Sequence, residues 1–204
     1  MKPPLDPDFV ARLRGHAAGP EPAPDAGLPP FARAAVTALL RPRAGELELL
    51  LMVRTRRDND RWSGQVCMPG GRVEPEDVDL IATARRETRE ELGFDPADAG
   101  ELVGRLSPIR ARARGGLLPL VIQPYVWLAE RDVEARVGPE AEDHFWLPLS
   151  AAARGDLDGT LRLVEAGSTF VLPTWTFAER VVWGLTHRMA SELLDVVTAG
   201  RKGR

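Results

Sequence analysis

The sequence predicts an α+β fold, or an α/β/α sandwich, rather than a doubly wound α/β sheet. First, the expected strands and helices do not alternate regularly along the chain, as a doubly wound sheet would require. Second, the run LLLMV, residues 49–53, has the uniform apolarity of a strand that is buried on both faces. Third, 204 residues with a hydrophobic content of 44% are enough for one well-packed domain but not comfortably for two.

A proline-rich arm precedes this domain. Residues 1–30 hold eight of the 18 prolines, most densely in the stretch GPEPAPDAGLPP. Because proline lacks a backbone donor, we expect one short helix, from Pro7 to Arg14, and otherwise an extended segment. We therefore place the arm at residues 1–30 and the folded domain at residues 31–204.

The first half of the domain is expected to contain two strands and one helix. Residues 32–40 and 47–55 are the strands, and RPRAGE forms the turn between them. The polar loop RRDNDRWSG then leads to a double glycine. A helix is predicted from Asp77 to Leu92, because Gly93 follows as a helix-ending residue.

The second half is expected to contain three short strands and a closing helix. The strands are Glu101 to Leu106, Leu118 to Leu128 and the stretch HFWLPL, which follows an acidic loop. The helix runs from about Phe177 to Val197. Its apolar residues recur at helical spacing: Val181, Val182, Leu185, Met189, Leu193 and Val196.

Composition narrows the class of protein. The formal net charge of -3 and the pI of about 5.7 provide no basic field for nucleic acid or anionic membranes. The single cysteine, Cys67, excludes an intramolecular disulfide and suits a reducing compartment. No apolar run approaches the roughly 20 residues of a membrane helix. We expect a cytoplasmic protein with no nucleic-acid or membrane partner, and a homodimer as one form that it could take.

The predicted helix carries three carboxylates, Glu87, Glu90 and Glu91, at positions i, i+3 and i+4. At about 100° per residue, Glu91 falls about 20° inside the apolar arc and Glu87 about 20° outside it. An unpaired carboxylate at the edge of a core costs several kcal/mol or takes up a proton. Arg86 can neutralise one of the three but not all. A divalent cation can stabilise the set, whereas the alternative is a structural network of ion pairs.

The ligands available for such a cation are all hard oxygens. No histidine or further cysteine lies near these carboxylates in the sequence, which favours Mg²⁺ or Mn²⁺ over zinc. The turn Pro69-Gly70-Gly71 lies just before the helix and could add a backbone carbonyl. Its glycines would also let a phosphate chain approach the main chain closely. The predicted metal site thus combines Glu87, Glu90 and Glu91 with Gly71.

This segment resembles the Nudix box. The family pattern is a glycine, five residues, a glutamate, seven residues, then Arg-Glu-apolar-x-Glu-Glu-x-Gly-apolar, and Gly71 and the block from Arg86 to Phe94 follow it. The chain departs from it with Asp77 for the first glutamate, one extra residue before Arg86, and Thr88 at the apolar position. The resemblance implies an α+β Nudix-type α/β/α sandwich over about Phe31 to Val197, with a mixed sheet and a loop-helix-loop metal site. It also implies metal-dependent hydrolysis of a nucleoside diphosphate linked to another moiety.

A second segment, LLMVRTRRDNDRWSGQVCMPGG, resembles the region that precedes the box in coenzyme A pyrophosphatases. The residues that match are Leu50, Leu51, Arg54, Thr55, Arg61, Gly64, Val66, Pro69, Gly70 and Gly71. The resemblance implies cleavage of coenzyme A or acyl-CoA to adenosine 3′,5′-bisphosphate and 4′-phosphopantetheine. The alternatives are a Nudix hydrolase of ADP-ribose, a dinucleoside polyphosphate or an oxidised nucleotide, and a non-catalytic nucleotide-sensing module.

Candidate substrate contacts are the glycines Gly70 and Gly71 and three arginines, Arg54, Arg56 and Arg61, because guanidinium forks suit a polyanion. The alternating arginines at 110, 112 and 114 fit a solvated edge strand and a phosphate-contacting loop equally well.

Arg86 is expected to orient the carboxylates. In many Nudix proteins an acidic residue on a late loop reaches the metals or the attacking water. Here Glu142 is the candidate, with Glu140 as its alternative; the general base is Glu91, Glu140 or Glu142.

Overall fold

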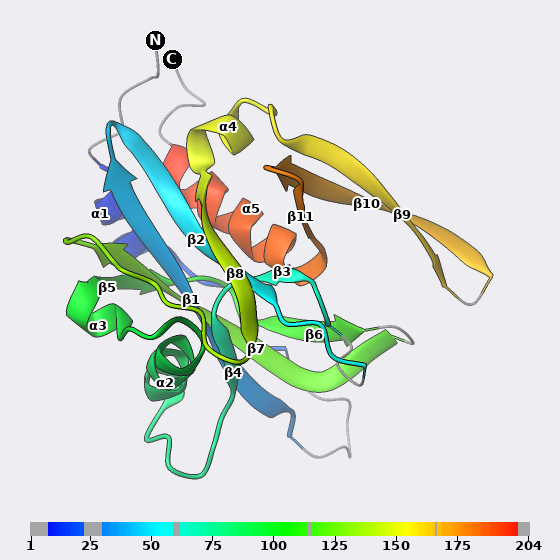
Figure 1. Cartoon of the computed structure of the whole chain (residues 1–204), viewed down its shortest axis with the longest axis horizontal. Helices are drawn as coiled ribbons and strands as arrows, with labels where there is room; N and C mark the ends of the chain where they lie inside the picture. Colours follow the sequence, from blue (N-terminus) through cyan, green and yellow to red (C-terminus); the bar gives the residue numbers. More distant parts are fainter. Residues whose placement is uncertain (1–7, 23–29, 59–61, 114–115, 166, 200–204) are drawn as a thin grey trace.

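The computed structural model describes residues 8–22, 30–58, 62–113, 116–165 and 167–199, and two sheets organise them (Figure 1). The larger sheet has eight strands, with the central order β3-β2-β1-β7-β5, while β4 pairs with β1, β6 with β7 and β8 with β2. Its strands are β1 (Ala32–Arg43), β2 (Glu46–Arg54), β3 (Val66–Cys67), β4 (Gly70–Arg72), β5 (Gly100–Arg105), β6 (Ile109–Ala113), β7 (Gly116–Ala129) and β8 (Ala141–Pro148).

The sheet is mixed because β1 has neighbours of both directions. It runs antiparallel to β2, with Leu40 opposite Leu49, and parallel to β7 over nine residue pairs from Ala32 to Leu40. The turn between β1 and β2 places Ala44 and Gly45 at positive φ, 49° and 77°. Such a two-residue turn matches the twist of a hairpin. The predicted strands at 32–40 and 47–55 are therefore confirmed, with small shifts at their ends.

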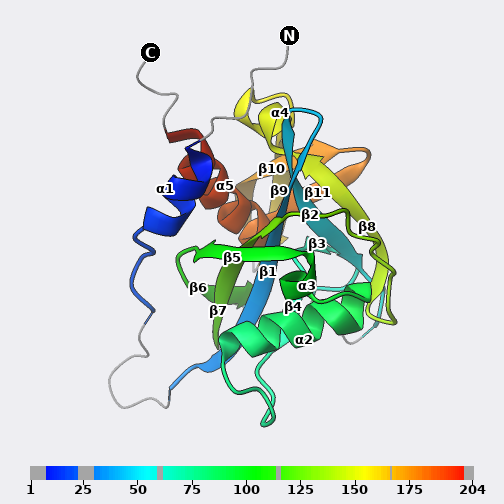
Figure 2. The same cartoon turned by 90° about the vertical axis from the view of Figure 1, so that its left-hand side faces the viewer.

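Helices cover both faces of this sheet, which makes the α/β/α sandwich. Helix α2 (Leu80–Leu92) lies on one face, where Leu92 joins a buried cluster with Leu39 and Leu50. Helix α5 (Gly184–Thr198) lies on the other face, where Leu193 joins the larger cluster with Leu49. Figure 2 shows the two helices on opposite sides of β1 and β2. Neighbouring strand residues point to opposite faces, so the apolar run of β2 serves both layers.

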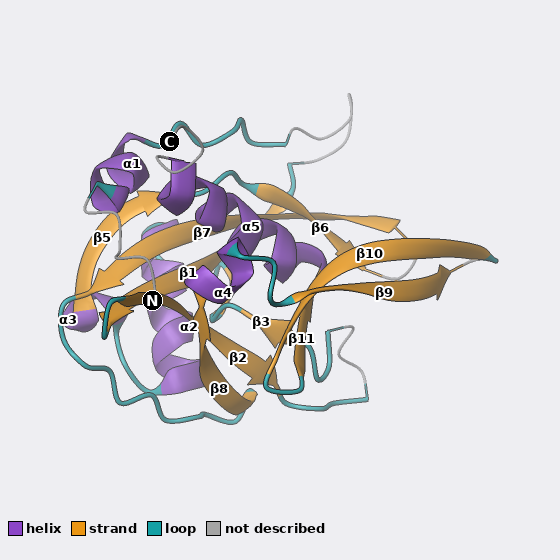
Figure 3. Cartoon of the chain, turned by 90° about the horizontal axis from the view of Figure 1, so that it is seen from above, coloured by secondary structure: helices purple, strands orange, loops and turns teal. Residues whose placement is uncertain are grey.

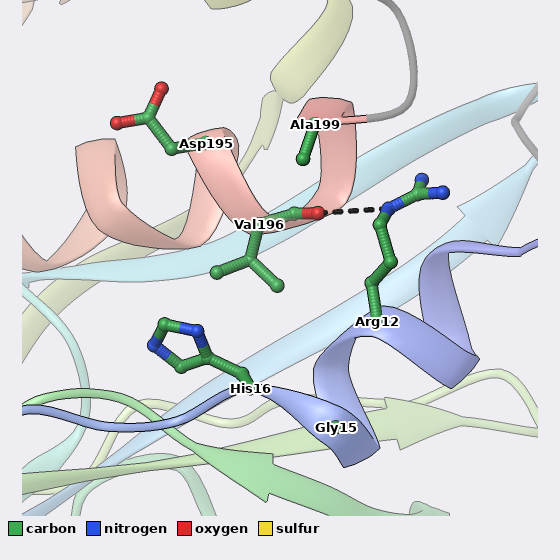
Figure 4. Close-up of a pocket in the computed structure, with 6 residues that line it drawn as sticks. All are labelled: Arg12, Gly15, His16, Asp195, Val196 and Ala199. Atoms are coloured by element: carbon green, nitrogen blue, oxygen red, sulfur yellow. Dashed lines mark hydrogen bonds between the residues drawn. The ribbon is translucent and has the colours of Figure 1, made fainter.

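Part of the N-terminal arm is attached to the body of the protein. Helix α1 (Phe9–Gly15) buries Phe9 and Leu13 and packs beside α5. Arg12 Nε donates to the Val196 carbonyl at 3.0 Å, at the C-terminal end of α5 (Figure 4). A cation is favourable there because the last carbonyls of a helix lack partners. The helix predicted from Pro7 begins at Phe9, and Pro7 itself lies outside the described residues.

The closing helix is shorter than predicted, because a second sheet precedes it. Strands β9 (Asp158–Glu165), β10 (Ser168–Phe177) and β11 (Arg180–Trp183) form a three-stranded antiparallel sheet (Figure 3). The prediction was wrong for Val181 and Val182, which lie in β11, and α5 begins only at Gly184. Ala178 and Glu179, at φ 46° and 64°, form a tight turn between β10 and β11. A turn with two positive φ values joins strands, and adjacent β-branched residues favour a strand.

Smaller elements also differ from the prediction. Helices α3 (Pro96–Ala99) and α4 (Leu149–Ala153) were not predicted, and the Arg110-Arg112 run forms β6. Arg110 donates to the Leu118 carbonyl at 3.0 Å and stacks over the ring of Phe31. Its guanidinium is therefore engaged in contacts within the fold. Arg114 lies outside the described residues.

Among the helices of the described chain, none has the length and apolarity that spanning a membrane requires.

Candidate functional site

The site is built on helix α2, whose ends are defined by local signals. Asp79 is the N-cap, and its side chain accepts from the Ala82 backbone N–H at 2.7 Å. Gly93 ends the helix at φ 74°, a left-handed conformation that suits glycine. The helix therefore begins three residues after the predicted start at Asp77. This shift leaves Asp77 in the preceding loop, from which it can reach back to the helix.

Glu91 is a nearly fully buried carboxylate, 1% exposed, as the helical spacing predicts. Its Oε2 accepts from the Gly70 backbone N–H at 2.8 Å, and Arg54 Nη1 lies 3.7 Å from its Oε1. Burial raises its pKa to about 8, with further repulsion from Glu87 and Glu140, although Gly70 and Arg54 oppose the rise. The guanidinium of Arg54, at 3.7 Å, does not compensate for the loss of hydration of the Glu91 carboxylate.

Glu87 lies between Arg86 and the glycine turn. Burial raises its pKa above the ordinary range, and Arg86, whose Nη1 donates to Oε1 at 3.0 Å, opposes the rise. The turn approaches so closely that a Cβ on Gly71 would overlap the carboxylate of Glu87. Gly71 is therefore required by the position of a side chain rather than by its own φ. The structure thus brings the glycine turn and the carboxylates together, as the sequence suggests.

Arg86 lies at the centre of an ion-pair network. Its Nε and Nη2 bind the two oxygens of Asp77, each at 3.0 Å, and Nη2 also donates to the Arg72 carbonyl at 2.9 Å. The hydrogen bonds from Arg86 lower the pKa of Asp77 to about 2. Asp77 therefore anchors Arg86, although it replaces the glutamate of the family pattern. Glu90 is 58% exposed and receives only a long contact from Arg86, at 3.4 Å.

The carboxylates suit a divalent cation in chemistry, although they are not gathered into a cage. Over the described ranges, no three His, Cys, Asp or Glu side chains are close enough together to hold a metal ion as they stand. Burial and mutual repulsion nevertheless disfavour the ionised forms of Glu87 and Glu91 and raise both pKa values, so a cation bound beside them would stabilise their charged forms. Their donors are hard oxygens, and the exposed Glu90 can reorient. The donor set therefore fits Mg²⁺ or Mn²⁺ after rearrangement of the side chains.

The predicted substrate arginines are only partly gathered at this site. Arg54 ends β2 and faces Glu91, whereas Arg56 is exposed and its stem lies against Gly64. Arg61 lies outside the described residues. The sequence analysis did not single out Arg57, which binds Glu140 at 3.0 Å and also donates to the Pro139 carbonyl. No local pattern distinguishes Arg57 from its neighbours, since its partners come from a loop more than 80 residues away.

The late acidic loop lies against the end of α2, where the Gly138 N–H donates to the Glu91 carbonyl at 2.7 Å. The charge of Glu140 contributes to the raised pKa values of both Glu87 and Glu91. Its backbone carbonyl accepts from the Thr55 N–H at 3.0 Å, which ties this loop to the end of β2. Glu142 lies in β8 and is exposed, next to the point where the register between β8 and β2 shifts. Of the two alternatives, Glu140 is the one whose charge acts on the carboxylates of α2.

Known proteins resemble the chain in sequence. The family model described as NUDIX domain matches residues 31–165. The mitochondrial coenzyme A diphosphatase NUDT8 of Mus musculus is 28% identical over 183 residues, covering 82% of this chain and 80% of that protein. The uncharacterized Nudix hydrolase NudL of Photorhabdus laumondii is 30% identical over 149 residues, covering 72% of this chain and 76% of its own length.

Solved structures resemble the chain in fold. A C. elegans Ap4A hydrolase in a binary complex has a TM-score of 0.50 and 19% identity, covering 85% of this chain and 99% of its own. A MutT/nudix family protein from Enterococcus faecalis has a TM-score of 0.50 and 16% identity, covering 86% of this chain and 63% of its own. At these identities the likeness establishes the fold alone. It agrees with the mixed sheet and the helices on both faces, and the predicted fold class is confirmed.

Proposed function

The chain belongs to the NUDIX family and is a pyrophosphohydrolase of that family, and we propose that its substrate is coenzyme A or an acyl-CoA. The products would be adenosine 3′,5′-bisphosphate and 4′-phosphopantetheine. The substrate proposal is supported by the 28% identity to a coenzyme A diphosphatase over 82% of the chain. It is also supported by Arg54, which comes from the segment that resembles coenzyme A pyrophosphatases and faces the buried Glu91.

The residues divide into those that hold a cation and those that hold the substrate. Nudix hydrolases generally use divalent metal ions, and we propose Mg²⁺ or Mn²⁺ on Glu87, Glu90 and Glu91 with the carbonyl of Gly71. A cation bound there would polarise the phosphate oxygens and lower the pKa of an attacking water. Arg86, whose Nη1 donates to Glu87 Oε1 at 3.0 Å, would hold this carboxylate in place.

The glycine turn and the arginines would receive the polyanion. Gly70 and Gly71 are proposed to contact the pyrophosphate through their main chain, because the missing Cβ atoms let this turn lie close to β1 and to the Glu87 carboxylate. Arg54, Arg56 and Arg61 are proposed to contact its phosphates through charge-assisted hydrogen bonds. The contribution of Arg54 is twofold, because its guanidinium also faces Glu91.

The substrate proposal predicts that 3′-dephospho-CoA is hydrolysed less efficiently than coenzyme A. Each 1.4 kcal/mol of lost interaction with the 3′-phosphate lowers kcat/KM about tenfold. The measurement compares the two substrates in wild type and in Arg54→Ala, Arg56→Ala and Arg61→Ala. Replacing the arginine that binds the 3′-phosphate should reduce the ratio of kcat/KM for coenzyme A to kcat/KM for 3′-dephospho-CoA, as in a double-mutant cycle. Arg43→Ala is the matched control, because Arg43 is exposed at the far end of β1.

Two results would contradict the substrate proposal. Equal kcat/KM for coenzyme A and 3′-dephospho-CoA in wild type would remove the 3′-phosphate from recognition. Preferential turnover of ADP-ribose or a diadenosine polyphosphate would replace coenzyme A as the substrate while the pyrophosphohydrolase assignment stands. Arg54→Ala is expected to slow both substrates because of its contact with Glu91, so only the ratio between substrates is informative.

Glu140 rather than Glu142 is proposed as the acidic residue of the late loop. Glu140→Gln is expected to lower kcat about a hundredfold or more if it acts on the attacking water. Glu142→Gln makes the same chemical change two residues away at an exposed site, and it should retain nearly full activity. Steady-state turnover of coenzyme A at saturating Mg²⁺ measures both. A larger loss in Glu142→Gln would restore the original sequence prediction of Glu142.

We also propose three further properties of this protein. They are a cytoplasmic location, a domain boundary near residue 30, and a homodimer as one form of the protein. The folded α1 within residues 1–30 packs on α5, so removal of the arm would expose apolar surface of the domain.

A further inference from the structure

A pair of buried threonines joins helix α2 to strand β1. Thr37 and Thr88 are both 0% exposed, and their hydroxyl oxygens lie 2.8 Å apart. The Ala84 carbonyl lies 2.7 Å from Thr88 Oγ1 and 3.2 Å from Thr37 Oγ1. Thr88 occupies the position at which the Nudix pattern has an apolar residue. The hydroxyl of Thr88, which replaces an apolar group of the pattern, therefore has a hydrogen-bond partner across the packing interface, in β1.

The two hydroxyl hydrogens can make two of these three contacts at a time, in either of two arrangements. Either Thr88 donates to Ala84 and receives from Thr37, or Thr37 donates to Ala84 and receives from Thr88. Both arrangements leave no buried hydroxyl unpaired. Two apolar side chains would fill this space without burying polar atoms, and burying those atoms is unfavourable. What the hydroxyls add over an apolar pair is a directional link between helix and sheet.

Thr37 also holds the glycine turn. Its backbone N–H donates to the Pro69 carbonyl at 2.8 Å, and the next residue, Gly70, donates to the Glu91 carboxylate. Thr88 lies between Glu87 and Glu91 on the buried side of the helix. The turn and the helix, which together carry the proposed ligands, are thus both attached to one residue of β1.

We propose that Thr37 and Thr88 are positioning residues that hold the carboxylates of α2 at a set distance from the Pro69–Gly71 turn. They touch neither the substrate nor the metal ion. The proposal rests on the proposed function, since it assumes that these carboxylates bind the ion. Thr37 is the more important of the two, because it supplies every contact of the group that crosses from β1 to the helix. After loss of the Thr88 hydroxyl, Thr37 can still donate to the Ala84 carbonyl.

The test separates the hydroxyl of Thr37 from its shape. Thr37→Val keeps the shape and removes the hydroxyl, whereas Thr37→Ser keeps the hydroxyl and removes a methyl group. We expect Thr37→Val to lower kcat about tenfold with little change in KM, because small displacements of catalytic groups reduce rates strongly. Thr37→Ser should retain most of the activity, even if it unfolds at a lower temperature. The reverse order, with Val active and Ser impaired, would show a packing role and overturn the proposal.

Mn²⁺ binding, measured by calorimetry without substrate, distinguishes failure of this proposal from failure of the proposed function. Thr37→Val should weaken Mn²⁺ binding by several-fold, and Thr88→Val by less. If wild type binds Mn²⁺ but hydrolyses no substrate, the proposed function fails and this measurement still decides the role of the pair. Unchanged Mn²⁺ affinity and unchanged kcat in Thr37→Val would reject the positioning role.

A matched control exists in helix α5. Thr198 Oγ1 donates to the Leu194 carbonyl at 2.7 Å, the same four-residue contact that Thr88 makes with Ala84. Thr198→Val should leave both kcat and Mn²⁺ affinity at the wild-type level. The double variant Thr37→Val/Thr88→Val should have a kcat no lower than that of Thr37→Val, because the link is already broken in the single variant. Additive losses would show that the two hydroxyls act separately and would contradict the proposed pair.

Discussion

Replacement of Glu91 by glutamine is expected to lower kcat by at least about a hundredfold while the protein remains folded, because metal catalysis supplies several kcal/mol. The amide has nearly the same shape as the carboxylate, and its oxygen can still accept from the Gly70 N–H. It lacks the charge that a cation requires. Turnover of coenzyme A at saturating Mg²⁺ is the measurement. A rate above half that of wild type would exclude Glu91 as a ligand.

The same variant should change how stability depends on pH in the metal-free protein. The pKa of Glu91 is about 8 in the folded state and near 4.5 when the chain is unfolded. Between these values the folded state binds a proton that the unfolded state has lost, so the contribution of Glu91 to stability falls as pH rises. Above about pH 8 the loss is complete, at an order of a few kcal/mol. Glu91→Gln should therefore be more stable than wild type at pH 8, and the difference should vanish near pH 4.

Glu90→Gln is the matched comparison for both effects. Glu90 is a proposed ligand like Glu91, so its kcat should fall by a similar factor. It is 58% exposed, however, so the stability of the variant should follow that of wild type from pH 4 to pH 8. Denaturant unfolding with a chelator present measures this at each pH. A pH dependence altered equally in both variants would show that burial of Glu91 is not the cause.

Gly71→Ala is expected to lower kcat by about tenfold to a hundredfold with only a small change in stability, since misplaced ligands slow catalysis strongly. The added Cβ would overlap the carboxylate of Glu87, which is the far end of a flexible side chain and can move aside at the expense of its contact with Arg86. The movement displaces a proposed ligand without unfolding the domain. Turnover and thermal unfolding of the same preparation test both parts of the expectation.

The neighbouring glycine provides the contrast. A Cβ on Gly70 would overlap the backbone of Ala35 and Val36, and its φ of 149° disfavours other residues. Gly70→Ala should therefore be destabilised as a whole. Gly15→Ala, where a Cβ meets nothing within 4 Å, should behave as wild type in activity. Full activity in Gly71→Ala would show that Glu87 can act from another position.

Local sequence was sufficient to identify the helix and its buried carboxylate. The spacing of apolar residues placed Glu91 inside the core-facing arc, and it is 1% exposed in the structure. The double glycine before the helix pointed to a turn that approaches the carboxylates. Both features depend on residues less than about 25 positions apart, whose relative placement follows from helix geometry and turn chemistry.

Local sequence failed where two structures share a pattern. Val181 and Val182 fit the apolar stripe of a helix, and they also fit a strand of β-branched residues. Pairing with β10 decides in favour of the strand, with Val182 opposite Trp175 and Val181 opposite Thr176. The partner strand begins 13 residues before Val181, and its hydrogen bonds do not appear in any local periodicity.

The sequence by itself determined the class of fold and the placing of three carboxylates on one helix next to a glycine turn, because these features depend on residues that are near one another in the chain. Only the tertiary structure decided that the charge of Glu140, two residues before Glu142, acts on Glu87 and Glu91, and that Thr88 has Thr37 as its partner. These choices depend on contacts between residues about 50 apart, through the packing of α2 on β1 and the register of β8 on β2. A shift of one residue along β8 would move its side chains to the opposite face, and no single strand encodes that register.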